Sequence, residues 1–296
     1  MLVTFRQANA LDMGRLLLVS AIWGSSFVFI DLALRSFGPI TVAALRITMA
    51  SLVLLAIAYS RESLIKLGRK EWLIIFVVGL LNSALPFFLI SWAQQHINAA
   101  EAAVLMATGA FSSLILSHFT TSDERINGAR ALGLLVGFIG VLVLFWDDLQ
   151  GNDVVTISAL AAVTGAGMCY ATSGVLARRI SEVPAVTMAT YTVTSAMLYM
   201  LPLALFLETP KFADATLISW SSATYLGVIA TAFAYIMRFT IIRTNGAVFA
   251  SQAGYLVPVF GTFWGWLLLS NQIRPELGIS LVIILCGVFI TRKGVK

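Results

Sequence analysis

The chain alternates long apolar runs with short polar breaks from one end to the other. A helix needs about 20 apolar residues to cross the hydrocarbon core of a membrane. Strands that span a membrane would instead give ~10-residue segments of alternating polarity, which the chain lacks. The runs therefore predict an all-α bundle of ten transmembrane helices, with boundaries good to about ±3 residues. The expected spans are 14–34, 39–59, 72–93, 99–119, 129–146, 154–177, 185–207, 218–239, 247–269 and 276–291.

Composition agrees with this pattern. Hydrophobic residues make up 59% of the 296 positions and charged residues only 11%, whereas a soluble protein has about 25% charged residues. So few charges cannot cover a surface that faces water. We therefore expect a multi-pass integral membrane protein that is embedded in the lipid bilayer.

The basic residues of the loops fall mostly on one side of the ten expected spans. Fifteen lie in the termini and the loops after every second helix, and three lie in the other loops. Lys and Arg concentrate in cytoplasmic loops, so both termini are expected in the cytoplasm and the protein in the cell inner membrane. The net charge of +5 is this topological bias, and no nucleic-acid partner is expected.

Weak internal repeats divide the chain near its middle. Trp23 aligns with Tyr170, Pro39 with Pro184, and the segment 96–111 with 244–259. These matches predict two five-helix repeats, at 13–147 and 154–292. Because five is odd, the second repeat enters the membrane from the opposite face and is inverted. Inverted repeats are characteristic of secondary transporters, which bind their substrate near the midplane between the repeats.

Several motifs resemble one known family. They are "AIWGSSFVFI" in the first span, "PITVAALRITMA" in the second, "LVPVFG" in the ninth, and "SDERING" followed by "GLLVGFIGV" at the fifth. With them, nearly the whole chain resembles the drug/metabolite transporter superfamily of the ten-helix EamA type. It is most similar to the bacterial exporters of amino acids, aromatic ones included. The resemblance implies two inverted repeats around a central cavity, and the second-span arginine typical of the family is Arg46 here.

Arg46 is a charge inside an apolar span, about 10 Å from the outer edge at ~1.5 Å per residue. An unpaired Arg near the bilayer centre costs about 2.5–3.5 kcal/mol, so it needs a partner or water. We expect a pair with Asp31, for which Arg35 competes, and Glu101 is a further carboxylate on the outer half. A structural arginine that fixes helix packing is favoured over one that binds a substrate carboxylate.

Amphipathic and aromatic side chains at mid-depth suggest a cavity lined by both repeats. A polar group in hydrocarbon is costly unless it is paired or faces water, although packing against a neighbour explains any single one of them. Ala107 and Tyr255 form a repeat-related pair with bulk on one side only. The candidate lining residues are Trp23, Asn82, Phe87, Ala107, Thr108, Tyr170, Tyr191, Tyr235, Gln252 and Tyr255.

Other chemistry is sparse. The two histidines, His96 and His118, form no HExxH motif, and no phosphate-binding glycine loop occurs. We expect no enzyme activity, no metal site and no cofactor. Gly133 and Gly137 form a GxxxG pair that favours packing within the bundle over a dimer contact, and a monomer is expected.

Together these features predict a carrier that moves small metabolites by alternating access and exports amino acids. A drug or other metabolite exporter of the same fold is the alternative. A channel-like facilitator is less favoured, because it needs a continuous polar pore or carbonyl filter.

Overall fold

The computed structural model is helical wherever it has regular structure among the residues that it describes. Six of these helices are long and apolar enough to cross a membrane, and three shorter apolar helices accompany them. The described residues are 9–61, 64–109, 111–112, 115–116, 127–144, 146, 154–180, 182–245, 249, 252–270 and 274–293.

The first half contains two long helices, a composite helix and two shorter ones. The composite helix runs from α3 through the π-helical turn η1 into α4 without a break. The bounds are α1 (Ala10–Leu34), α2 (Pro39–Ser60), α3 (Arg69–Gly79), η1 (Leu80–Ala84), α4 (Leu85–Ala93), α5 (Ala99–Met106) and α7 (Gly128–Leu144).

The second half has long, composite and shorter helices in a similar order, and its composite helix from α11 to α12 contains a longer π-helical stretch, η4. The bounds are α9 (Val154–Arg178), α10 (Ala185–Leu203), η2 (Ala204–Glu208), η3 (Phe212–Asp214), α11 (Leu217–Thr224), η4 (Tyr225–Phe233), α12 (Ala234–Asn245), α14 (Ala253–Leu269) and α15 (Pro275–Lys293).

Helix starts follow the local sequence. The side chains of Asn9 and Asn98 each accept a hydrogen bond from the backbone N–H three residues on. The carboxylates of the residues there, Asp12 and Glu101, accept one from the backbone N–H of Asn9 and Asn98. These capping boxes satisfy backbone N–H groups that a helix leaves free at its first turn. Pro39 begins α2 after Gly38, in the position where its missing N–H costs nothing.

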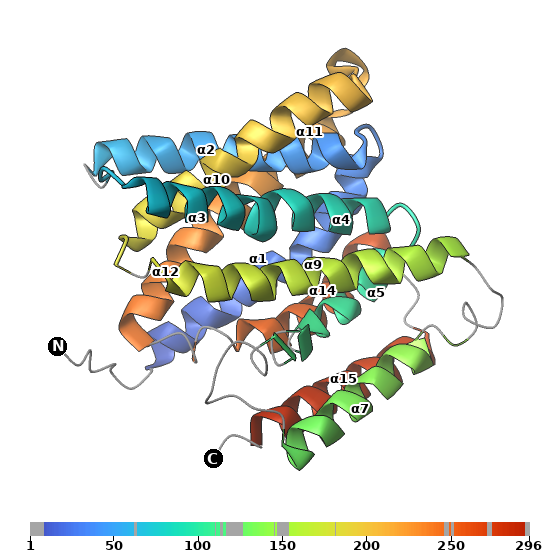
Figure 1. Cartoon of the computed structure of the whole chain (residues 1–296). Helices are drawn as coiled ribbons and strands as arrows, with labels where there is room; N and C mark the ends of the chain where they lie inside the picture. The colour runs from blue at the N-terminus through green and yellow to red at the C-terminus, as the bar shows by residue number, and fades with distance from the viewer. Residues whose placement is uncertain are drawn as a thin grey trace.

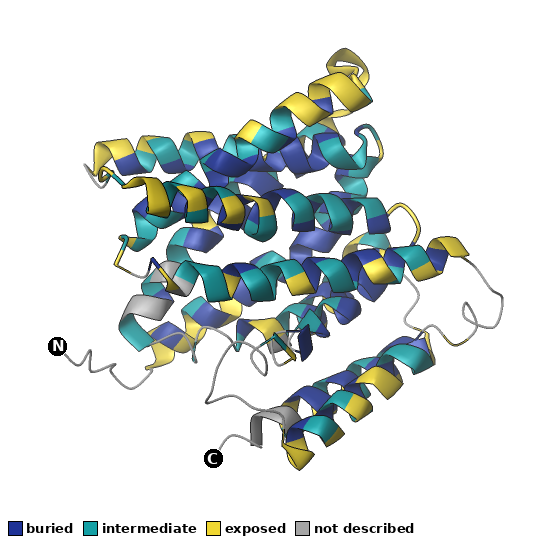
Figure 2. Ribbon diagram, in the orientation of Figure 1, coloured by how far each residue is buried: buried dark blue, intermediate teal, exposed yellow. Residues whose placement is uncertain are grey.

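Helices from the two halves are packed against each other throughout the main body. α2 lies along α10, α1 lies along α14, and α4 lies along α9. Figure 2 shows that buried residues line the faces between these helices, while exposed residues face outward. Most of the core is therefore formed between the halves and not within either one.

Helices α7 and α15 form a pair set to one side of the main body (Figure 1). A Cβ atom on Gly287 would lie 2.6 Å from both the Gly133 oxygen and the Gly137 nitrogen, so the two backbones are in direct contact there. The GxxxG motif thus serves packing within the chain, as expected, because small residues let membrane helices approach closely.

The expected fourth and ninth spans are seen only in part. α5 ends at Met106, and short helical pieces follow at 109, 111–112 and 115–116. Positions 107–108 form a turn, and positions 110, 113–114 and 117–119 of the expected 99–119 span lie outside the described residues. α14 begins at Ala253, six residues after the expected start of the ninth span.

We predict that Gly287→Ala destabilises the protein by about 1–3 kcal/mol, because the added methyl group has no room against the α7 backbone. The midpoint of thermal unfolding in detergent measures this effect. Gly278→Ala on the same helix is the matched control, since a Cβ atom there meets nothing within 4 Å. Equal midpoints for the two variants would contradict the close contact.

Candidate functional site

The buried guanidinium of Arg46 is held by a hydroxyl in the π-helical stretch η4. Its Nε donates to Thr231 Oγ1 at 2.8 Å, and that hydroxyl donates in turn to the Leu226 carbonyl at 2.8 Å. The i→i+5 bonding of a π-helix places residue 231 over residue 226. The wide turn thus presents a hydroxyl that is already oriented when Arg46 reaches it.

A glycine allows α2 to approach this turn. A Cβ atom on Gly227 would lie 2.6 Å from the Met49 Cβ and 2.9 Å from the Arg46 carbonyl oxygen. Gly79 lies 148 positions before Gly227 and likewise allows α10 to approach the start of η1. A Cβ atom on Gly79 would lie 2.8 Å from the Thr192 carbonyl oxygen. Both π-helical turns are therefore crossed closely by a helix from the other half.

One face of the Arg46 guanidinium lies on an aromatic ring. Its central carbon is 3.8 Å from the centroid of Phe87, which is itself buried. The terminal nitrogens Nη1 and Nη2 have no hydrogen-bond partner within the described part of the chain, and neither is fully enclosed. A fork of N–H donors therefore remains available beside an apolar wall.

Asn82 joins three helical segments next to Arg46. Its amide nitrogen donates to the Tyr235 hydroxyl at 3.1 Å, and its amide oxygen accepts from Ser173 at 3.2 Å. Tyr170, one turn before Ser173 on α9, and Tyr235 both lie near Arg46. Four of the expected cavity residues, on η1, α4, α9 and α12, are thus gathered around one cation.

Trp23 lies where the hydrophobic clusters of the core meet. Its indole nitrogen donates to the Ala230 carbonyl of η4 at 3.1 Å, and the Arg238 guanidinium lies 5.8 Å from its ring centroid. Tyr170, which aligns with Trp23 in the repeats, also packs against both large clusters. The deep indole N–H of Trp23, which needs a partner, is therefore bonded to a backbone carbonyl.

The expected pairing of Arg46 with Asp31 is wrong. Asp31 forms an ion pair with Arg35, one turn along α1, at 3.4 Å, and both side chains are partly exposed. Glu101 accepts from Arg274 at 2.6 Å and also caps its own helix through Asn98. Both carboxylates therefore pair with other arginines near helix ends, and the partner of Arg46 is the neutral hydroxyl of Thr231.

The remaining candidates have other surroundings. Tyr191 lies on a groove between α3 and α10, and its hydroxyl donates to the Ile65 carbonyl at 3.1 Å. Ala107 belongs to the larger hydrophobic cluster, and the Thr108 hydroxyl donates to the Leu105 carbonyl. Gln252 immediately precedes α14. The side chain of Tyr255 lies outside the described residues.

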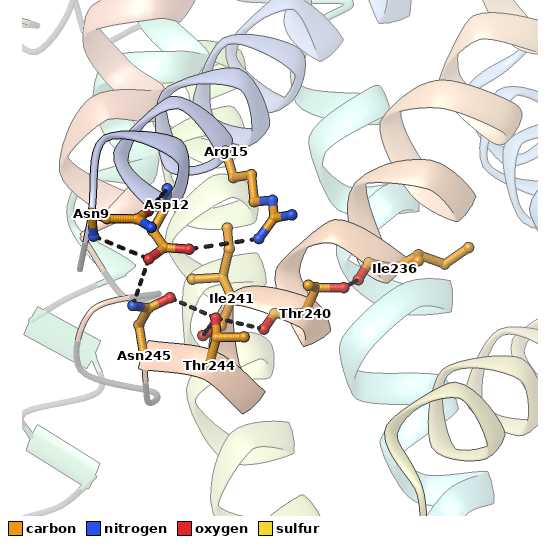
Figure 3. A network of polar contacts seen from close by, with 8 residues as sticks. All are labelled: Asn9, Asp12, Arg15, Ile236, Thr240, Ile241, Thr244 and Asn245. Carbon is orange, nitrogen blue, oxygen red and sulfur yellow. Dashed lines mark hydrogen bonds and ion pairs between the residues drawn. The ribbon is translucent and has the colours of Figure 1, made fainter. Parts of the chain in front are cut away.

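A polar network joins the start of α1 to the end of α12 (Figure 3). The fully buried Asp12 carboxylate accepts from the Asn9 backbone and from the Asn245 amide, both at 3.1 Å, and lies 3.6 Å from Arg15. With the Trp23 bond at mid-length, α1 is thus attached to the second half at more than one depth.

Sequence reasoning missed Thr231, Asp12 and Glu208. The carboxylate of Glu208 accepts from the backbone nitrogens of Ile40 and Thr41 at 2.9 and 2.7 Å, which caps α2. The Asn-x-x-Asp pattern at the start of α1 is a capping signal that could have revealed Asp12. Nothing in the local sequence distinguishes Thr231 from other threonines in the spans.

Among the described residues, no group of three or more His, Cys, Asp and Glu side chains could hold a metal ion. The site therefore consists of Arg46, amide and hydroxyl groups, and aromatic rings, with Arg238 beside Trp23.

The profile of the EamA-like transporter family matches residues 14–146 and again residues 157–292. The chain belongs to this family. It is thus a multi-pass membrane protein of the drug/metabolite transporter superfamily.

Relatives at low identity cover most of the chain. It is 22% identical to the uncharacterized transporter YoaV of Bacillus subtilis, over 92% of this chain and 93% of the relative. It is 25% identical to a "Probable amino-acid metabolite efflux pump" of Salmonella typhimurium, over 95% and 94%. It is 27% identical to a "Probable terminal-alkyne amino-acid exporter" of Streptantibioticus cattleyicolor, over 82% and 80%. A crystal structure with 19% identity shares the fold, with a TM-score of 0.68 over 96% of each chain.

We predict that Thr231→Val destabilises this EamA-like transporter by about 1–3 kcal/mol. Valine keeps the shape but leaves the buried Arg46 Nε without its acceptor. Thr231→Ser retains the hydroxyl and should stay within about 1 kcal/mol of the native protein. Thermal unfolding of the purified variants checks both values, and a fully stable Thr231→Val protein would mean that this hydroxyl is dispensable.

Proposed function

We propose that this EamA-like transporter exports amino acids across the inner membrane by alternating access. Both termini would be cytoplasmic, and the halves 13–147 and 154–292 would be inverted five-helix repeats around a central site. Membership of a transporter family supports the general function. The names of the Salmonella and Streptantibioticus relatives support the substrate class.

The observation that carries the proposal is the free end of the Arg46 guanidinium. Thr231 occupies Nε and Phe87 covers one face, which leaves the two terminal nitrogens for a ligand. A planar guanidinium binds a carboxylate through two parallel hydrogen bonds. In this arrangement Arg46 serves as both a structural and a substrate-binding residue, the two roles that its sequence position leaves open.

The surroundings favour a zwitterion with an apolar side chain. No carboxylate side chain among the described residues pairs with Arg46, so its charge is available for a substrate anion. Phe87, Trp23 and Tyr170 offer aromatic surface for the substrate side chain and ammonium group. Asn82 and Tyr235 add the few polar groups that fix orientation.

The bonded contacts between the halves at this level include Trp23 with Ala230 and Asn82 with Tyr235. Both involve a π-helical turn, a feature that is frequent at functional sites. Alternating access in inverted-repeat carriers moves one half against the other around a fixed midplane site. The proposed carboxylate site lies between the two halves, as expected for a site that keeps hold of the substrate while one half moves against the other.

We predict that neutral amino acids are moved by counterflow in proteoliposomes, and that their methyl esters are moved at least about 30-fold less efficiently. Losing a buried charge partner costs about 2 kcal/mol or more, which corresponds to this factor. In Arg46→Gln the preference for acid over ester should disappear, because neither compound meets a guanidinium.

Arg35→Gln is the matched control and should retain the full preference, since Arg35 is exposed and its ion pair among the described residues is with Asp31. A well-folded Arg46→Gln protein that still distinguishes acid from ester as the native protein does would exclude carboxylate binding by Arg46. A native protein that moves no amino acid at all would favour a drug or other metabolite as the substrate.

A further inference from the structure

A groove of about 380 Å³ lies between α3 and α10, and its lining includes none of the residues that contact Arg46. Two aromatic residues of α3 and four residues of α10 line it: Trp72, Phe76, Tyr191, Thr194, Ser195 and Leu198. Helix α3 belongs to the first half and α10 to the second. The groove is therefore a seam between the two halves of the protein.

The groove offers mainly hydrocarbon and aromatic surface, and its three hydroxyl groups are all bonded within the protein. The Tyr191 hydroxyl is bonded to Ile65, the Thr194 hydroxyl to Ser51 at 2.8 Å, and the Ser195 hydroxyl to its own helix at 2.8 Å. Trp72 packs against Tyr191 with ring centroids 4.8 Å apart. A ligand in this groove must therefore be apolar where it enters.

Four exposed cations stand beside one end of the groove: Arg61, Lys66, Arg69 and Lys70. None of them has a carboxylate partner within the residues that the structure covers. Arg69 lies three residues before Trp72, on the same face of α3, so its charge continues the groove by one turn. The bond from Tyr191 to Ile65 holds the segment that carries Lys66 against the same end.

The nearby carboxylates do not neutralise this cluster. The segment 61–71 contains two of them, Glu62 and Glu71, against the four cations. The Glu71 carboxylate folds back against Gly68, at the first turn of its own helix, where a negative charge is favourable. The end of the groove therefore keeps a net positive charge.

We propose that this groove binds one anionic phospholipid of the surrounding membrane, with an acyl chain between Trp72 and Leu198 and the phosphate at Lys66 and Arg69. The apolar groove matches the chain, and the unpaired cations match the headgroup. Basic pockets between membrane helices on the cytoplasmic side bind anionic headgroups in this way. The bound lipid joins α3 to α10 and so stabilises the contact between the halves.

Native mass spectrometry of the purified protein with phosphatidylglycerol or phosphatidylcholine of identical acyl chains tests the proposal. We expect the native protein to retain phosphatidylglycerol preferentially and to melt at a higher temperature with it. The double variant Lys66→Gln/Arg69→Gln should lose this preference, at roughly fivefold per charge removed. Arg179→Gln, an exposed cation beyond the end of α9, is the control and should keep it.

A second pair of variants tests the groove itself. Leu198→Trp fills it and should reduce phosphatidylglycerol binding, whereas Leu205→Trp, exposed on the same composite helix, should not. Both side chains face outward, so both variants should fold. Equal retention of the two lipids by the native protein would overturn the proposal, as would equal effects of Arg179→Gln and the double variant. Displacement of the lipid by inorganic phosphate alone would identify a phosphate site and overturn the lipid assignment.

Discussion

A permanent charge within an apolar helix is the constraint on which the centre of this transporter depends. Arg46 cannot lose its proton, and an uncompensated guanidinium in the membrane is costly. The structure compensates it with a hydroxyl of η4 and an aromatic face of α4, and Tyr170 of α9 and Tyr235 of α12 lie nearby. Because these elements come from both halves, placing one charge requires the two halves to be assembled correctly.

The π-helical turns make that assembly possible. A regular α-helix satisfies its backbone internally and gives a neighbour little to bond. At η4 the Ala230 carbonyl accepts from Trp23 and the Thr231 hydroxyl accepts from Arg46, while Gly227 allows α2 to come close. At η1, Asn82 bonds to Tyr235 and Ser173, and Gly79 allows α10 to come close. Each π-helical turn thus makes hydrogen bonds to the other half and has a glycine that lets a helix of the other half come close.

The ends of the helices are fixed by different means. The Asp12 network holds α1 to α12, and Glu208 and the Glu101–Arg274 pair each tie one half to the other near helix ends. These contacts are polar and differ in exposure, because the Asp12 carboxylate is fully buried whereas Arg274 is exposed. Together with the central contacts, they hold the two halves to each other along the length of the helices.

Sequence alone was sufficient for the features that depend on local composition and period. Apolar runs and breakers located the long helices, because crossing hydrocarbon imposes a length and a polarity on each segment. The glycines at 133 and 137 indicated close packing, and the depth of Trp23 and Arg46 required partners for both.

The identity of those partners was decided only by the tertiary structure. Asp31 was expected to pair with Arg46 because both lie in the outer half and the helix of Asp31 precedes that of Arg46, but Asp31 instead pairs with Arg35, four residues along its own helix. The true partner, Thr231, lies 185 positions away and faces Arg46 because a π-helical turn changes the direction of its side chain. Helix rotation and π-helical turns depend on packing between distant segments, which no local pattern records.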